Sequence, residues 1–153
     1  MTTTFEPRVL GPAQLAERAQ AIAGRPEEWI HRVRLSTDGR WYERLHSDAE
    51  HEIWLISWLP GQATGLHDHG GASGAFAVAL GSLGEHRVDG GRTVSAGQVR
   101  GFGPGYIHDV RNESDAPAVS VHVYSPPLSV MNRYDLDGDG RLVLLAAESA
   151  EDW

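Results

Sequence analysis

Residues 61–69 read GQATGLHDH, and they place two histidines, His67 and His69, one residue apart in a glycine-rich segment. A third histidine, His108, follows later in a second glycine-rich segment. On a β-strand, residues i and i+2 point to the same face, so we expect His67 and His69 to aim their imidazoles at one point. We expect a neighbouring strand to bring His108 there. Three neutral nitrogen ligands can hold a divalent first-row metal and leave coordination positions open for reactants.

Short strand-like segments, separated by Gly, Pro, Asn and Asp, make up most of the chain that follows its first third. Before them, Leu15, Ala19 and Ile22 fall on one face of a predicted helix over Pro12–Ala23, which Gly24 ends. Many short strands at regular spacing predict an all-β fold, a closed sandwich or barrel, after this short helical segment. The predicted strands cover residues 40–45, 52–59, 75–80, 84–88, 99–102, 107–110 and 118–124.

The chain has 153 residues, a formal net charge of −8 and no cysteine. We expect a single domain over residues 1–153, with the helical segment at about 12–29 and the barrel at about 30–146. The acidic balance argues against nucleic acid or an anionic membrane as a partner. Without cysteine no disulfide can form, and any metal must be held by nitrogen and oxygen ligands. We find no signal-peptide pattern and no apolar stretch of membrane-spanning length, so we expect a cytoplasmic location.

Ser120, His122 and Tyr124 alternate with valines and therefore share one face of a predicted strand. The valines face the other way, into apolar packing. Polar side chains on an inward face are costly unless they are hydrogen-bonded. We expect the three to form a relay that orients the Tyr124 hydroxyl, and the alternative is a purely structural network.

Tyr42 and Arg44 share a face of another predicted strand. An inward arginine suits a substrate carboxylate, because its planar fork can bind both oxygens. The alternative is an ordinary surface arginine.

Other polar patterns in the sequence are assigned structural roles. Residues 135–140 read DLDGDG and resemble the start of a calcium loop, but the twelfth position is Ala146 where a bidentate glutamate is needed. We therefore predict a polar hairpin turn there. The histidines without partner spacing are predicted to have surface or packing roles: His31, His46, His51 and His86.

The two histidine segments together resemble the two-part signature of the cupin superfamily. The matching positions are Gly61, His67, His69 and Gly81 in the first part, and Gly97, Gly105, His108 and Asn112 in the second. The resemblance implies a cupin-type β-barrel (jelly roll). The usual glutamate ligand falls at Ser73 or Gly74, so that carboxylate is missing. The usual proline of the second part falls at Gly103.

Within the cupins, the chain resembles the cysteine dioxygenase family of thiol dioxygenases between Tyr42 and Pro127. The matching segments are 67–69, 81–85, 108–112 and 117–127, the last of which ends in Tyr-Ser-Pro-Pro. The family holds one ferrous ion on three histidines, so the resemblance implies Fe(2+) on His67, His69 and His108. It also implies Tyr124 as the active-site tyrosine with His122 and Ser120 as its relay, and Arg44, with Tyr42 beside it, as the carboxylate-binding residue.

Animal members of that family link the tyrosine to a cysteine at the position of Gly74. This chain has no cysteine. The resemblance therefore implies the bacterial type, in which Tyr124 is a free phenol.

The resemblance implies a reaction in which both atoms of O₂ are added to the sulfur of L-cysteine, giving cysteine sulfinic acid. A related branch oxidises 3-mercaptopropionate and usually has Gln at the position of Arg44, so Arg44 favours L-cysteine. Two other classes stay open: a cupin metal enzyme of another type, and a non-catalytic cupin that binds a metal or small ligand. The expected partners are a small thiol and O₂, with no nucleic acid and no membrane. The oligomeric state is left open, and a monomer is compatible with the sequence.

Overall fold

A computed structural model describes residues 8–149. Helix α1 has the predicted bounds, Pro12–Ala23, and two short 3₁₀ turns follow it at Pro26–Glu28 and Ile30–Arg32. Within residues 8–149, none of the helices has the length and hydrophobicity that crossing a membrane requires. The strands are β1 (Trp41–Ser47), β2 (Glu52–Trp58), β3 (Ser73–Leu80), β4 (Ser82–Arg87), β5 (Gly90–Ser95), β6 (Val99–Phe102), β7 (Asp109–Arg111), β8 (Ala118–Ser125), β9 (Val130–Leu136) and β10 (Leu142–Ser149).

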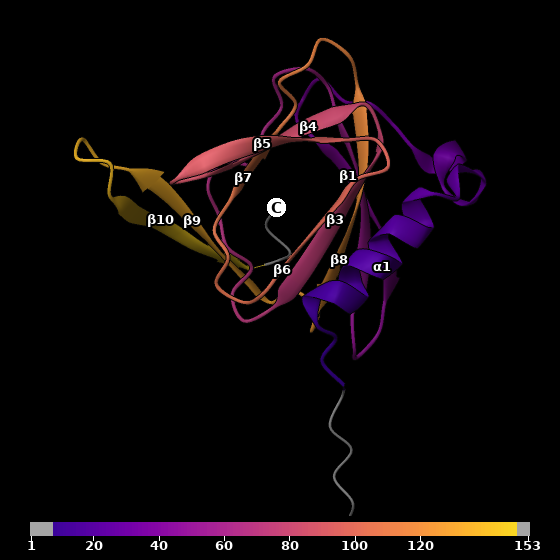
Figure 1. Ribbon diagram of the computed structural model, residues 1–153, viewed down its shortest axis with the longest axis horizontal. Helices are drawn as coiled ribbons and strands as arrows, with labels where there is room; N and C mark the ends of the chain where they lie inside the picture. Colours follow the sequence, from indigo (N-terminus) through magenta and orange to yellow (C-terminus); the bar gives the residue numbers. More distant parts are fainter. Residues whose placement is uncertain (1–7, 150–153) are drawn as a thin grey trace, which may run out of the picture.

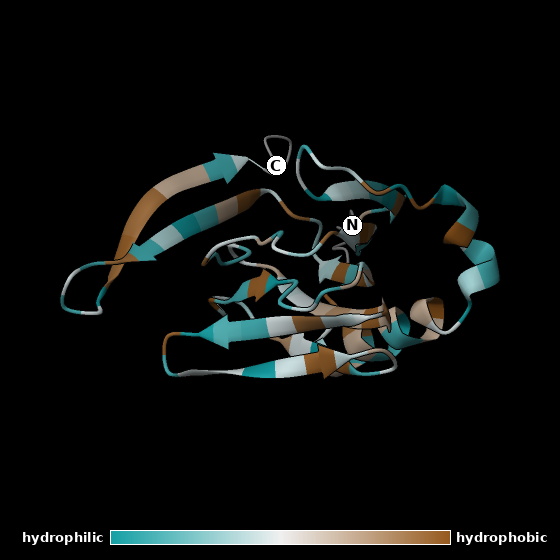
Figure 2. Cartoon of the chain, turned by 90° about the horizontal axis from the view of Figure 1, so that it is seen from above, coloured by the Kyte–Doolittle hydropathy of each residue, from teal (hydrophilic) through white to brown (hydrophobic). Residues whose placement is uncertain are grey.

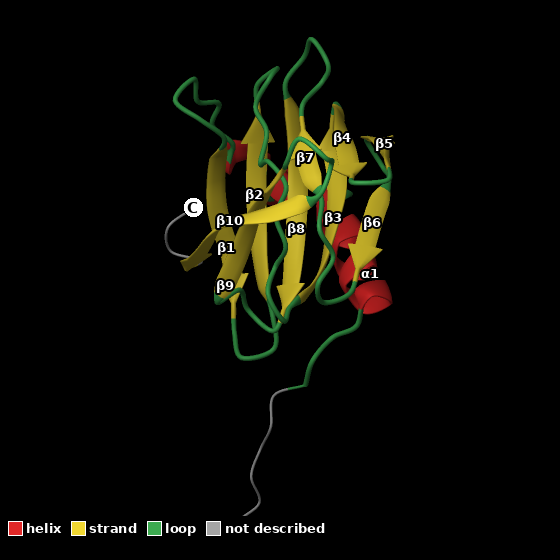
Figure 3. Ribbon diagram, turned by 90° about the vertical axis from the view of Figure 1, so that its left-hand side faces the viewer, coloured by secondary structure: helices red, strands yellow, loops and turns green. Residues whose placement is uncertain are grey.

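The strands form an antiparallel barrel, which confirms the predicted all-β fold with one N-terminal helix. One wall is a five-stranded sheet in the order β1-β2-β8-β3-β6, whose strands lie side by side in Figure 3. All seven predicted strands are present, with shifted ends. The prediction omits three strands, β5, β9 and β10. It misses β5 because Gly90 and Gly91 suggest a turn, whereas they open the strand.

The opposite wall is built around a three-stranded sheet in the order β5-β4-β7. Backbone hydrogen bonds extend it through the segment that carries the first two histidines: Thr64 N donates to Val110 O at 2.9 Å. Tyr134 N donates to Leu66 O at 2.9 Å and brings β9 to the other side of that segment. The first histidine segment therefore lies between β7 and β9, although it forms isolated bridges rather than a regular strand.

The β9–β10 hairpin projects away from the barrel (Figures 1 and 2). Its turn holds the DLDGDG sequence, as predicted. An isolated two-stranded hairpin is marginally stable in water, so its attachment to the barrel matters. A bridge between His67 and Arg133 supplies part of that attachment.

Alternation along the strands produces two hydrophobic cores. In β8, Val119, Val121 and Val123 face outward and pack beneath α1 together with Leu15 and Ala19. That orientation was predicted for the valines. The other core fills the barrel with residues such as Trp58, Phe76 and Phe102. The polar residues Ser120, His122 and Tyr124 alternate with the valines and are also buried.

Gly74 lies opposite Tyr124 in the β3–β8 pair and opposite Phe102 in the β3–β6 pair. A Cβ atom at this glycine would lie 2.6 Å from Phe102 Cε2 and 2.9 Å from Tyr124 Cδ1. Such contacts are shorter than van der Waals separations. The two rings therefore occupy the space that any larger residue at position 74 would need.

We expect Gly74→Ala to lower the free energy of unfolding by roughly 1–3 kcal/mol, because it overpacks the barrel interior. Urea unfolding followed by tryptophan fluorescence measures this change. The matched control is Gly138→Ala in the β9–β10 turn, where a Cβ has no neighbour within 4 Å. Equal stability of the two variants would show that the rings move aside without cost.

Candidate metal centre

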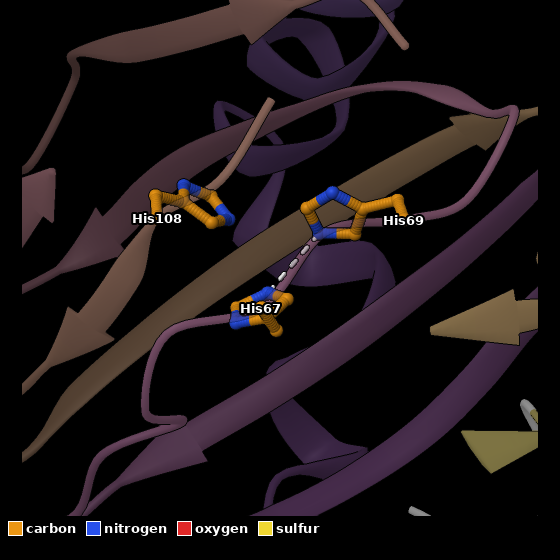
Figure 4. Close-up of side chains that lie close together, drawn as sticks. All are labelled: His67, His69 and His108. Carbon is orange, nitrogen blue, oxygen red and sulfur yellow. Dashed lines mark hydrogen bonds between the residues drawn. The ribbon is translucent and has the colours of Figure 1, made fainter. Parts of the chain in front are cut away.

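His67, His69 and His108 converge inside the barrel (Figure 4). Each side chain offers one ligand atom, and the three atoms lie within 4.8 Å of one another. The Nε2 atoms of His67 and His69 are 3.2 Å apart. Each of the three residues is only 2% exposed. The structure thus brings together the three histidines that the sequence spacing singled out.

A backbone pair joins the two histidine segments. His67 N donates to His108 O at 2.9 Å, and His108 N donates to His67 O at 3.0 Å. Asp68, between the two histidines, turns its carboxylate the other way, where it accepts a hydrogen bond from the Tyr134 hydroxyl at 2.6 Å. The alternation that separates Asp68 from its neighbours therefore keeps the carboxylate out of the histidine cluster.

Hydrogen bonds select the nitrogen that His67 and His108 present to the cluster. His67 Nδ1 lies 2.9 Å from Gly65 O, and because a carbonyl only accepts, Nδ1 carries the proton. His108 Nδ1 lies 2.9 Å from Glu85 Oε2, which is likewise an acceptor. The lone pairs of both Nε2 atoms are therefore available. A partner that fixes the second ring nitrogen is the usual support of a histidine metal ligand.

Burial favours the neutral, cation-binding form of two of the three histidines. It lowers the pKa of His67 and of His69 well below the usual value, and the neighbouring histidines lower both further. Burial raises the pKa of Glu85, but hydrogen bonds and charge from His108 and Arg100 outweigh it, and the net shift is downward. Three imidazole nitrogens, with an ionised carboxylate hydrogen-bonded to His108, fit a divalent first-row metal.

Next to the histidines runs a hydrogen-bond chain on β8. Trp58 Nε1 donates to Ser120 Oγ at 2.9 Å, and Ser120 Oγ lies 2.7 Å from His122 Nε2. His122 Nδ1 lies 3.3 Å from the Tyr124 hydroxyl oxygen. The chain therefore holds the Tyr124 hydroxyl through His122 and Ser120.

Burial keeps His122 and Tyr124 of this chain uncharged. Burial lowers the pKa of His122 to about 3, so the ring is neutral at physiological pH. Burial also raises the pKa of Tyr124, which keeps the phenol protonated. The Tyr124 ring stacks on His69 with centroids 5.1 Å apart. The expected Ser–His–Tyr relay is therefore present, and it lies against one of the three clustered histidines.

Arg44 and Tyr42 lie farther out on β1. The Arg44 side chain is 54% exposed, and its Nη1 atom is 3.8 Å from Oε2 of the buried Glu52. The Tyr42 ring packs edge-on against Trp54 at 5.9 Å. The guanidinium of Arg44 therefore neighbours a carboxylate of the protein itself. Its role in holding a substrate carboxylate stays a prediction.

Arg40, just before β1, lies near the site. Its guanidinium carbon lies 5.3 Å from the centre of the Trp58 ring. Its charge contributes to lowering the pKa of His67 and of His122, which places it beside both. Burial and the nearby Arg133 lower the pKa of Arg40 itself.

The sequence reasoning missed three residues of this site: Arg40, Trp58 and Glu85. Arg40 lies two and four positions before Tyr42 and Arg44, so strand alternation places all three on one face. The sequence around Trp58 does not show whether its indole N–H donates a hydrogen bond or its ring only packs in the core. Glu85 would have been found as an acidic residue in a strand-like segment, once that strand was known to pair with the one that follows His108.

Solved structures with a similar fold support the barrel assignment. A protein with a double-stranded β-helix domain from Klebsiella pneumoniae has a TM-score of 0.59, with 20% identity over 76% of this chain and 93% of that one. A sugar phosphate isomerase of the cupin superfamily from Silicibacter pomeroyi has a TM-score of 0.56, with 22% identity over 74% of this chain and 78% of that one. At these identities the likeness concerns the fold alone.

A protein-family model described as cysteine dioxygenase type I matches residues 12–137. The match includes helix α1, all three clustered histidines and the whole of the relay on β8. The family match, the cupin-like fold and the buried histidine cluster therefore agree: the chain belongs to the cysteine dioxygenase type I family.

Proposed function

We propose that this protein is a non-haem iron thiol dioxygenase that oxidises L-cysteine with O₂ to cysteine sulfinic acid. The observation that carries the proposal is the convergence of three buried histidine nitrogens beside a tyrosine hydroxyl that His122 holds in place. A ferrous ion held by His67, His69 and His108 would supply the redox chemistry that joins dioxygen to sulfur. Family membership supports the same class of reaction.

The charge of the site favours an anionic thiol substrate. The three histidine side chains contribute no negative charge that would offset a bound cation. Arg40 adds a positive charge beside His67 and His122. A thiolate and a carboxylate on one small molecule match this arrangement.

Tyr124 would donate its hydroxyl proton to the substrate or to the oxygen atoms being transferred. His122 and Ser120 orient that hydroxyl, and Trp58 donates a hydrogen bond that holds Ser120 in place. A donor that is already oriented costs no reorganisation when charge develops during the reaction.

For the substrate carboxylate we propose Arg40 in addition to the arginine predicted from sequence, Arg44. Arg40 lies beside the histidines and the relay, whereas Arg44 is largely exposed and near Glu52. The planar guanidinium of either residue could bind both carboxylate oxygens. Only Arg40 has its charge coupled to the groups at the proposed reaction centre.

The proposed activity is tested by loading metal-free protein with Fe(2+) under anaerobic conditions and then measuring oxygen uptake with three thiols: L-cysteine, 3-mercaptopropionate and cysteamine. We expect the fastest uptake with L-cysteine, with one sulfinate formed per O₂, and no uptake in His67→Ala. His86→Ala, which removes a histidine outside the site, is the control. Preference for 3-mercaptopropionate would reassign the substrate. Cysteine binding without oxygen uptake would favour a ligand-binding cupin, and activity with another metal would favour a different cupin enzyme.

Arg40→Gln should reduce kcat/KM for L-cysteine about ten- to hundredfold, because a charged hydrogen-bond donor is worth roughly 1.5–3 kcal/mol. Turnover of cysteamine, which has no carboxylate, should change little. Arg44→Gln is the matched comparison, measured in the same steady-state assay. A loss for cysteine in the Arg44 variant but not in the Arg40 variant would return the role to Arg44.

Tyr124→Phe should lower kcat for L-cysteine by about a hundredfold, the lower range for loss of a positioned proton donor. It should also lower the yield of sulfinate per O₂ consumed. Parallel measurement of oxygen uptake and sulfinate tests both effects. Tyr106→Phe is the control, because its ring also packs near His108, at 5.3 Å, while its hydroxyl interacts with Arg100. Unchanged rate and yield in Tyr124→Phe would remove the proposed role.

A further inference from the structure

We propose that His46, Asp48 and His51, at the turn between β1 and β2, form a second binding site for a divalent first-row cation. The ligand atoms of these three side chains lie within 4.8 Å of one another. The group is separate in the fold from the histidines inside the barrel and does not depend on the proposed dioxygenase activity. His46 and His51 were predicted from sequence to have surface or packing roles, and the structure brings them together.

An irregularity in β1 brings the two imidazoles onto one face. Arg44 pairs with Trp54, but the register then shifts, and His46 pairs with Ile53. Without this bulge, His46 would share the inner face with Arg44. Ile53 belongs to the core beneath α1, so its cross-strand partner His46 lies on that outer face. The ring of His51, the residue before β2, is 4.8 Å from the ring of His46.

Asp48 connects the two histidines. Its Oδ2 atom lies 2.8 Å from His46 Nε2, and its Oδ1 atom lies 3.3 Å from His51 Nδ1. Backbone N–H groups of Glu50 and His51 also donate to Oδ1, which fixes the carboxylate in the turn. Hydrogen bonds from His46 and from this backbone lower the pKa of Asp48, so it is ionised. Two imidazoles and one carboxylate suit Zn²⁺, Co²⁺, Ni²⁺ or Cu²⁺.

An independent observation shows a nitrogen that lacks a partner at this point. His51 is only 4% exposed, and its Nδ1 atom is buried with no hydrogen bond to any residue in 8–149. His51 Nδ1 lies 3.3 Å from Asp48 Oδ1, but the two atoms are not aligned for a hydrogen bond. An unsatisfied buried polar atom is costly. A cation between Nδ1 and the carboxylate would satisfy both.

Arg18 on α1 would compete with the cation. Its Nη1 atom lies 3.0 Å from His51 Nε2, and because a guanidinium only donates, Nε2 accepts and Nδ1 carries the proton. A cation on Nδ1 requires the opposite tautomer, with the proton on Nε2. The Arg18 hydrogen bond and the bound cation therefore exclude each other. Arg18 is exposed, so its side chain can turn into solvent when the cation binds.

The test is the stoichiometry of Zn²⁺ binding to the metal-free full-length protein, measured by equilibrium dialysis. We expect two equivalents in the unmodified protein and one in His46→Ala, whose exposed side chain can be removed without disturbing a core. His86→Ala is the matched control and should keep two, because His86 also pairs with a carboxylate, Glu113, but has no second histidine in its group. Two equivalents in His46→Ala would overturn the proposal.

Arg18→Ala provides a second measurement. Removal of the competing donor and of its positive charge should tighten the Zn²⁺ affinity of the hairpin site severalfold, and the same change in a His46→Ala background should have no effect. If Arg18→Ala bound Zn²⁺ with the same affinity as the unmodified protein, the mutual exclusion of the Arg18 hydrogen bond and the cation would be wrong. His67→Ala separates the two proposals: it should lose the barrel equivalent and keep the hairpin equivalent, whatever the enzyme activity proves to be.

Discussion

The two-way hydrogen bond between the backbones of His67 and His108 is the constraint on which the rest of the site depends. These residues are far apart in sequence, and neither belongs to a regular strand. By exchanging both backbone hydrogen bonds, at 2.9 and 3.0 Å, they bring two glycine-rich segments together inside the barrel wall. His69 follows because alternation returns it to the face of His67, and Asp68 is turned toward β9 by the same alternation.

Around this pair, hydrogen bonds determine which ring nitrogens of His67 and His108 carry the proton. Gly65 O and Glu85 orient His67 and His108 so that the same nitrogen, Nε2, faces the cluster. The indole of Trp58 donates to Ser120 at the start of the relay that ends at Tyr124. Burial acts on both groups, since it lowers the pKa of His67 and of His122 and raises the pKa of Tyr124. One set of contacts thus turns imidazole nitrogens toward one point, and the other orients the Tyr124 hydroxyl.

Much of this could be predicted from local patterns. The period of the apolar residues gave helix α1 its bounds, and the Ser–His–Tyr alternation on β8 showed which face was polar. Strand ends and unpatterned strands were harder, as β5 shows, because two glycines serve equally well in a turn and at the start of a strand. The β1 bulge was also beyond the pattern: an extra residue in one strand reverses which side chains face inward, and sequence alternation cannot reveal it.

The sequence by itself determined the histidine set, the barrel class and the family resemblance, because these depend on residue types and short spacings that survive any arrangement of the strands. Only the tertiary structure decided which residues support His67 and His108 and which arginine lies beside the site. Glu85 meets His108, and Arg40 rather than Arg44 lies over Trp58, because strand register sets these contacts. Register results from the packing of the whole barrel, and no single segment encodes it.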